Sequence, residues 1–191
     1  GSVSNVVEQY DGTSWTTIPA TLGTARTSLT PTNAGTSSSY MVSGGNTGSI
    51  VGNSEEFTIS LLATTGGAWS SGANYPTTIQ DAAGAGPSTA AVLWGGYDGP
   101  AYDAETFEYD GTTWTESGDL NTARACYNVG TGSQTAALQA SGYATSDHTE
   151  NSEEYNGTAW TEGNNLNNPR YSATGGAVSY THLRAHETAY Y

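Results

Sequence analysis

Short runs of apolar residues separated by glycine-rich, polar segments recur along the chain. Tyr40-Met41-Val42 and Ala91-Val92-Leu93-Trp94 are typical of these runs, and the residues between them are mainly Thr, Ser, Asn and Gly. Runs of about four to eight residues bounded by turn formers are typical of β-strands. No long stretch has the periodicity of an amphipathic helix, so the pattern predicts an all-β protein built from short strands.

Two kinds of glycine motif punctuate these runs. Asp11-Gly12, Asp110-Gly111 and Asn156-Gly157 each lie between two strand-like segments. Such dipeptides favour a type I′ turn, which needs positive φ at both central residues, so we expect each to close a β-hairpin. The pairs Gly44-Gly45 and Gly95-Gly96 follow apolar runs. Because glycine has no Cβ, we expect another backbone to approach closely at these pairs.

A phrase related to Glu-Tyr-Asp-Gly-Thr-x-Trp recurs along the sequence. Its copies lie at residues 8–16, 108–115 and 153–161, and a looser copy runs from Glu55 to Trp69. The tryptophans of the four copies, Trp15, Trp69, Trp114 and Trp160, are 54, 45 and 46 residues apart. This period is typical of β-propeller blades and is longer than that of leucine-rich or ankyrin repeats.

A basic residue keeps the same phase as the tryptophans. Arg26, Arg124 and Arg170 follow them in Thr-Ala-Arg or a related phrase, and Gln80 takes the arginine's place in the remaining copy. One arginine per repeat suggests a structural role, and we expect each to face a glutamate of its own blade across the sheet. Adjacent strand residues face opposite sides, so the neighbouring glutamates of the repeats do not form the carboxylate pair of a glycosidase.

Together these features resemble the kelch repeat, with an arginine opening strand a, Gly-Gly closing strand b, Glu-Tyr on strand c and Trp on strand d. The resemblance implies a kelch-type β-propeller with four-stranded antiparallel blades, either four-bladed or truncated. Blade parts are expected at about 3–17, 25–70, 80–116, 124–162 and 170–178. The repeats are also similar to those of phage appendage, phage tail and metagenomic proteins. Whether the two ends complete one blade and close a ring stays open.

Residues 179–191 depart from the repeat. The string from Ser179 to Thr188 resembles a translated sequencing-library adapter, so we expect it not to be native; a genuine terminal strand or short helix is the alternative. His182 and His186 have helical metal-ligand spacing, but in such a segment the spacing is attributed to chance.

Composition narrows the classes of partner and chemistry. The formal net charge is -14, with four arginines and no lysine, which disfavours nucleic acid and anionic membranes. No run is apolar enough to predict membrane insertion. Cys126, the single cysteine, lies in a strand-like run and is expected to be a buried thiol. Only His148 lies outside the tail, too few histidines for a propeller copper oxidase, and adjacent Asp-Gly does not fit a sialidase Asp-box.

The loops between strands b and c differ from repeat to repeat, so they are the candidate binding face. Three tyrosines there are suited to stacking on sugar rings, and four polar residues to bonding hydroxyl groups. The candidate ligand-binding residues are Asn46, Tyr97, Asp98, Tyr102, Tyr143, Asp147 and His148. Two alternatives stay open, an ordinary solvated loop and a Ca²⁺ site at Asp98 and Asp103, although their spacing is not that of an EF-hand.

The sequence therefore predicts a non-catalytic binding module without cofactor or metal. Its expected partner is a glycan or surface protein, together with other subunits of a larger appendage, at a virion surface or in the extracellular space. The alternatives are a structural repeat array without a ligand of its own, and a fragment of a propeller enzyme.

Overall fold

The computed structural model describes residues 3–10, 12–32, 39–58, 68–127, 130–145 and 147–170. Within these ranges the chain is all-β and antiparallel, with three four-stranded sheets and two two-stranded hairpins. None of the described residues forms a helix long and apolar enough to cross a membrane.

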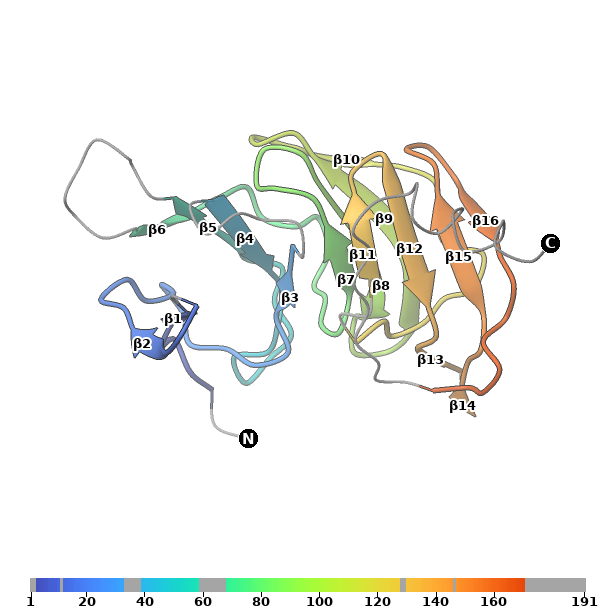
Figure 1. Ribbon diagram of the computed structural model, residues 1–191, viewed down its shortest axis with the longest axis horizontal. Helices are drawn as coiled ribbons and strands as arrows, with labels where there is room; N and C mark the ends of the chain where they lie inside the picture. The colour runs from blue at the N-terminus through green and yellow to red at the C-terminus, as the bar shows by residue number, and fades with distance from the viewer. Residues whose placement is uncertain are drawn as a thin grey trace.

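Each four-stranded sheet is one blade, and its strands lie side by side in chain order (Figure 1). The N-terminal hairpin is β1 (Glu8–Tyr10) and β2 (Trp15–Thr17). Blade I is β3 (Thr30–Pro31), β4 (Ser39–Ser43), β5 (Ser54–Thr58) and β6 (Ala68–Ser71). Blade II is β7 (Ala83–Ala85), β8 (Ala91–Tyr97), β9 (Tyr102–Tyr109) and β10 (Trp114–Glu116). Blade III is β11 (Gly130–Ser133), β12 (Ala136–Ala140), β15 (Ser152–Tyr155) and β16 (Trp160–Glu162), with β13 (Tyr143–Ala144) and β14 (Asp147–His148) as a small hairpin between β12 and β15.

The hydrophobic core lies between successive blades. The first strands β3, β7 and β11 contact one another in sequence, so the three sheets stand face to face along the array in Figure 1. One buried cluster joins Met41 of blade I to Leu93 and Phe107 of blade II. A second cluster includes Trp94 of blade II and Trp160 of blade III. Because each blade buries one face against the next, the core is shared between neighbouring blades.

A buried guanidinium fixes the interior of blade III. Arg124 forms an ion pair with Glu153, and their side chains are 0% and 1% exposed. Its Nη1 donates to the carbonyls of Ser141 and Asn151 at 3.3 and 3.0 Å. The second carboxylate oxygen accepts the backbone N–H of Asn121 at 2.6 Å. These bonds compensate for the removal of both charges from water.

Blade I repeats this arrangement atom for atom. Arg26 pairs with Glu55, and its Nη1 donates to the carbonyls of Gly44 and Asn53 at 3.0 and 2.8 Å. The backbone N–H of Gly23 donates to the second oxygen of Glu55 at 2.6 Å. The expected arginine–glutamate pairing across the sheet is thus confirmed in blades I and III.

In blade II the placement of Gln80 at the arginine position was wrong, because Ile79 occupies that position. The amide of Gly96 donates to the carbonyl of Arg124 at 2.8 Å, and the amide of Gly45 donates to that of Ile79 at 2.9 Å. Gln80 lies one residue later, where its backbone pairs with Tyr97.

In the other blades the motif has two further positions, the glutamate and the residue whose backbone N–H donates to that glutamate. Both of these positions also change in blade II. Strand pairing aligns Phe107 with Glu153, because Tyr109 and Tyr155 each pair with the tryptophan of the neighbouring strand. Ile79 and Phe107 belong to one buried cluster. Pro76, three residues before Ile79, has no N–H to donate to a carboxylate. Blade II therefore replaces the ion pair and its supporting donor by apolar contacts at the same positions.

Tyrosines of strand c bind blades II and III to the blade before each of them. Tyr109 donates its hydroxyl to Glu56 at 2.6 Å, and Tyr155 donates to Glu108 at 2.7 Å. Burial, and then the hydrogen bond to a carboxylate, raises the pKa of both tyrosines to about 12, so both hydroxyls keep their protons. The equivalent contact between the hairpin and blade I would involve Phe57, which has no hydroxyl.

The repeated tryptophans also reach across the blade interfaces. Trp114 donates its indole N–H to the carbonyl of Ala73, and Trp160 donates to Thr106 Oγ1, both at 3.0 Å. These two tryptophans therefore pack between blades. Trp15 of the N-terminal hairpin differs, because 68% of its surface is exposed.

The Asp-Gly motif does connect strands c and d, as β9 and β10 show, but not through a type I′ turn. Four residues separate the paired Tyr109 and Trp114, and only Gly111 among them has positive φ. Asp110 Oδ1 accepts the amides of Thr112 and Thr113 at 2.8 and 2.7 Å. The aspartate side chain thus supplies the turn's hydrogen bonds, so positive φ at its own position is not needed.

Candidate binding face

The three b–c loops begin at equivalent positions on one face of the array. The loops follow three pairs of residues with positive φ, which are Gly44-Gly45, Gly95-Gly96 and Ser141-Gly142. The first residue of each loop pairs with the segment that enters its own blade. These pairs are Asn46 with Thr27, Tyr97 with Gln80, and Tyr143 with Ala125. The glycines allow this approach, because a Cβ on Gly45 would lie 2.7 Å from the Thr27 carbonyl oxygen and one on Gly96 would lie 2.8 Å from that of Gln80. The close approach expected at the glycine pairs is confirmed.

Four of the seven predicted binding residues form a continuous row of rings. The ring centroids of Tyr97 and Tyr102 are 5.3 Å apart, those of Tyr102 and Tyr143 are 5.6 Å apart, and those of Tyr143 and His148 are 5.6 Å apart. Tyr97 pairs with Tyr102 across β8 and β9, and Tyr143 with His148 across β13 and β14. We call these four residues the aromatic row. Its three tyrosines are partly exposed and His148 is exposed.

The hydroxyl of Tyr102 remains neutral at physiological pH. Burial raises its pKa above the ordinary value, and the neighbouring Tyr143 and Tyr97 raise it further, because negative charges on adjacent phenols repel one another. A neutral phenol both donates and accepts hydrogen bonds. The middle of the aromatic row therefore offers an apolar ring and a hydroxyl that can donate or accept a hydrogen bond.

The predicted polar residues are partly engaged in their own loops. Asp98 Oδ1 accepts the amide of Ala101 at 2.7 Å, and Asn46 Oδ1 accepts that of Gly48 at 2.8 Å. Asp147 accepts the amide of His148 at 2.7 Å and also lies 3.2 Å from His148 Nδ1. The Asp147 side chain is 84% exposed, so of these carboxylates it is the one most open to a ligand.

The alternative Ca²⁺ site receives no support from the geometry of its two aspartates. Asp103 Oδ1 accepts the amide of Glu105 at 2.9 Å, so each aspartate has one oxygen in a local backbone hydrogen bond. Among the described residues, no three acidic, histidine or cysteine side chains gather in a metal-binding cluster.

Sequence reasoning missed a second set of residues, beside the first strand of each blade. Ser28, Asp81 and Tyr127 have φ of 51°, 55° and 48°, which is uncommon for residues with a side chain. Their backbones link successive blades, because the Asp81 amide donates to the Ser28 carbonyl at 3.5 Å and the Tyr127 amide donates to the Asp81 carbonyl at 2.9 Å. The signal available in the sequence was their place two or three residues after the arginine position.

Asp81 lies one residue after Gln80, whose backbone pairs with Tyr97 at the end of the aromatic row. Burial raises the pKa of the Asp81 carboxyl, while a hydrogen bond from the Ser28 side chain lowers it, and burial is the larger effect. A half-buried acid therefore lies one residue from the backbone pair that ends the aromatic row.

Three reactive groups described in the interior are a buried thiol and two paired carboxylates. Cys126 is buried, as expected, and burial raises the pKa of its thiol to about 12. A thiol of that pKa stays protonated and is a poor nucleophile. The buried carboxylates Glu55 and Glu153 are held by their arginines.

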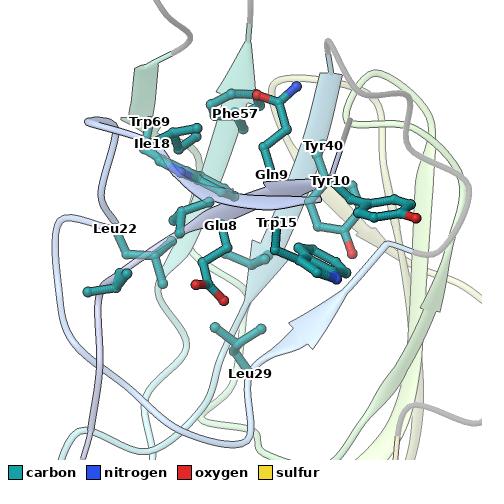
Figure 2. A pocket seen from close by; sticks show the side chains of 13 residues that line it. Glu8, Gln9, Tyr10, Trp15, Ile18, Leu22, Leu29, Tyr40, Phe57 and Trp69 are labelled. Carbon is teal, nitrogen blue, oxygen red and sulfur yellow. The ribbon is translucent and has the colours of Figure 1, made fainter. Parts of the chain in front are cut away.

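A cavity of about 590 Å³ lies away from the aromatic row, between the N-terminal hairpin and blade I (Figure 2). Its lining is mostly apolar and includes Trp15 and Ile18 of the hairpin segment and Tyr40 and Trp69 of blade I. Glu8 is the single charged residue in the lining. No predicted binding residue borders this cavity, and we call it the hairpin groove.

Comparison with known proteins shows the fold alone. No family model and no curated protein matches the sequence. Among solved structures, the chain resembles the structure of YjhT with a TM-score of 0.63 and 14% identity over 84% of this chain. The match covers 52% of the YjhT chain, so this chain spans about half of that protein. Together with the blades described above, this likeness identifies the fold as all-β, of the kelch-type β-propeller class.

Proposed function

We propose that the chain is a non-catalytic binding module that recognises a glycan through its loop face. The observation that carries this proposal is the aromatic row, whose four rings are contiguous across blades II and III. Sugar rings present apolar C–H faces edged by hydroxyls, and partly exposed tyrosines match both, with a flat ring and a polar tip.

Polar groups beside the row supply the hydrogen bonds that orient a sugar. Asp147 and His148 extend from β14 at one end of the row, and Asn46 with Gln80 lies towards the other end, where Asn46 Nδ2 is 3.4 Å from Gln80 Oε1. These groups accept from and donate to hydroxyls. The ligand class that fits is a neutral oligosaccharide, because a net charge of -14 repels polyanions.

The proposal places the protein on a virion or cell surface, in the extracellular space, where glycans and surface proteins are its partners. A kelch-like module of phage appendages would act there beside other subunits. The commitment of Cys126, Glu55 and Glu153 to the interior supports binding without catalysis.

The test is a glycan array probed with the full chain, with and without Ca²⁺, followed by titration of any selected glycan. Tyr102→Ala should weaken binding at least about tenfold, a loss of about 1.4 kcal/mol, because it removes the central ring. Tyr102→Phe should keep most of the affinity. Thr115→Ala removes an exposed side chain of β10, outside both the row and the hairpin, and serves as the control.

Selective binding that survives Tyr102→Ala would show that the row is not the site. If folded protein selects no glycan at all, the proposal fails and the chain is better described as a structural repeat array.

A further inference from the structure

Arg170 continues the arginine series beyond blade III. The amide of Gly142 donates to the carbonyl of Arg170 at 3.1 Å, just as that of Gly96 donates to the carbonyl of Arg124 at 2.8 Å. The backbone of Arg170 also pairs with Thr149. Arg170 therefore occupies, beside blade III, the position that Arg124 occupies beside blade II.

Glu8 continues the glutamate series at the other end of the chain. Tyr10 pairs with Trp15 in the hairpin as Tyr155 pairs with Trp160 in blade III, and this register places Glu8 at the position of Glu153. The Glu8 side chain enters the hairpin groove, where it is the single charged residue (Figure 2). Arg170 therefore occupies the arginine position, and Glu8 the glutamate position, of the ion pair that is found in blades I and III.

Within one molecule these halves are held apart. Arg170 is fixed by backbone hydrogen bonds to Gly142 and Thr149 of the blade III segment, while the hairpin that carries Glu8 lies against blade I. Figure 1 shows the hairpin and blade III at opposite ends of the array.

The hairpin also exposes a surface that the other blades bury. The ring pair Tyr155–Trp160 packs against blade II, and both residues are at least 94% buried. The equivalent residues Tyr10 and Trp15 have ring centroids 5.2 Å apart but are 51% and 68% exposed. Both also border the hairpin groove, and among the described residues no preceding blade covers the surface that they expose.

We propose that a second copy of this chain supplies that blade, with its blade III against the hairpin and its Arg170 paired with Glu8. Charge complementarity favours this partner, because the chain has only four arginines against 18 acidic residues, and Arg26 and Arg124 are already buried in ion pairs. Apolar burial of Tyr10 and Trp15 contributes to affinity, and the ion pair fixes the register. The association does not depend on glycan binding at the loop face.

The test is the mass of the full chain by size-exclusion chromatography with light scattering over a range of concentrations. The wild type should show twice the monomer mass or a larger multiple. Glu8→Arg and Arg170→Glu should each shift the protein to monomer, because like charges then meet, and the double variant E8R/R170E should restore the assembly. Glu116→Arg changes an exposed glutamate of blade II by the same charge and should leave the mass unchanged.

Both variant positions are exposed, so folding should survive and is checked by circular dichroism. A wild type that is monomeric at every concentration would overturn the proposal, even if the charge reversals altered its thermal stability, since that would indicate pairing within one chain. An assembly that E8R and R170E leave intact would overturn it as well.

Discussion

Three positions decide how each blade fills its interior, and they change together. Blades I and III use an arginine, a glutamate and a backbone N–H that donates to the glutamate, whereas blade II uses Ile79, Phe107 and Pro76. A buried ion pair is costly to desolvate, and a well-packed apolar pair of the same volume is an equivalent solution. The chain thus contains both solutions at one structural position.

This equivalence predicts the response of blade III to substitution. Glu153→Phe alone should destabilise the protein by about 3–5 kcal/mol, because it leaves the buried Arg124 without an opposite charge. The double variant R124I/E153F copies blade II and should recover most of that loss. Urea unfolding of the two single variants and the double variant measures the coupling free energy.

The same exchange in blade I, R26I/E55F, provides the matched comparison. If the double variant in blade III is no more stable than Glu153→Phe, the two interiors are not interchangeable and the covariation has another cause.

Among structural elements, the interface between the hairpin and blade I lacks a bond that the later interfaces have. Tyr109 and Tyr155 donate to glutamates of the preceding blade. At the equivalent positions the hairpin has Gln9 and blade I has Phe57, and both line the hairpin groove (Figure 2). Among the described interfaces, this one therefore lacks the phenol–carboxylate bond of the other two.

Restoring the bond should tighten the hairpin. The double variant Q9E/F57Y introduces the phenol–carboxylate pair and should stabilise hairpin docking by about 1 kcal/mol, because hydrogen bonds to charged groups contribute more than neutral ones. Hydrogen exchange of the β1 and β2 amides should slow about fivefold. Phe57→Tyr alone, which faces an amide, should slow it less; equal slowing would contradict the role assigned to the carboxylate.

Much of this element structure was predictable, because it is encoded in local signals. Asp-Gly and Asn-Gly marked the c–d connections, the glycine pairs marked close backbone approach, and the tryptophan period marked the blades. The exception in blade II arose because Ile79 and Gln80 both fit the spacing from Trp69, and polarity favoured the glutamine. The arginine position of blade II is identified by the hydrogen bond from the Gly45 amide to the Ile79 carbonyl, and the sequence does not reveal a bond between backbone groups.

At the scale of the whole molecule, the site depends on how blades stand beside one another. The sequence pointed to Tyr97, Tyr102, Tyr143 and His148, but their ring contacts depend on the small β13–β14 hairpin and on the register shift between Trp94 and Gly96. Ser28 and Tyr127 were missed, since neither is a residue type that marks positive φ. Loop geometry of this kind is set by tertiary packing.

The measurement that tests the binding account most directly is an NMR titration of the full chain, with labelled tyrosine rings, against the glycan selected on the array. The account predicts that the ring signals of Tyr97, Tyr102 and Tyr143 shift together and saturate with one dissociation constant, while the signal of Tyr10 stays in place. Shifts confined to Tyr10 or Tyr40, at the hairpin groove, would contradict it and move the site to the opposite end of the array.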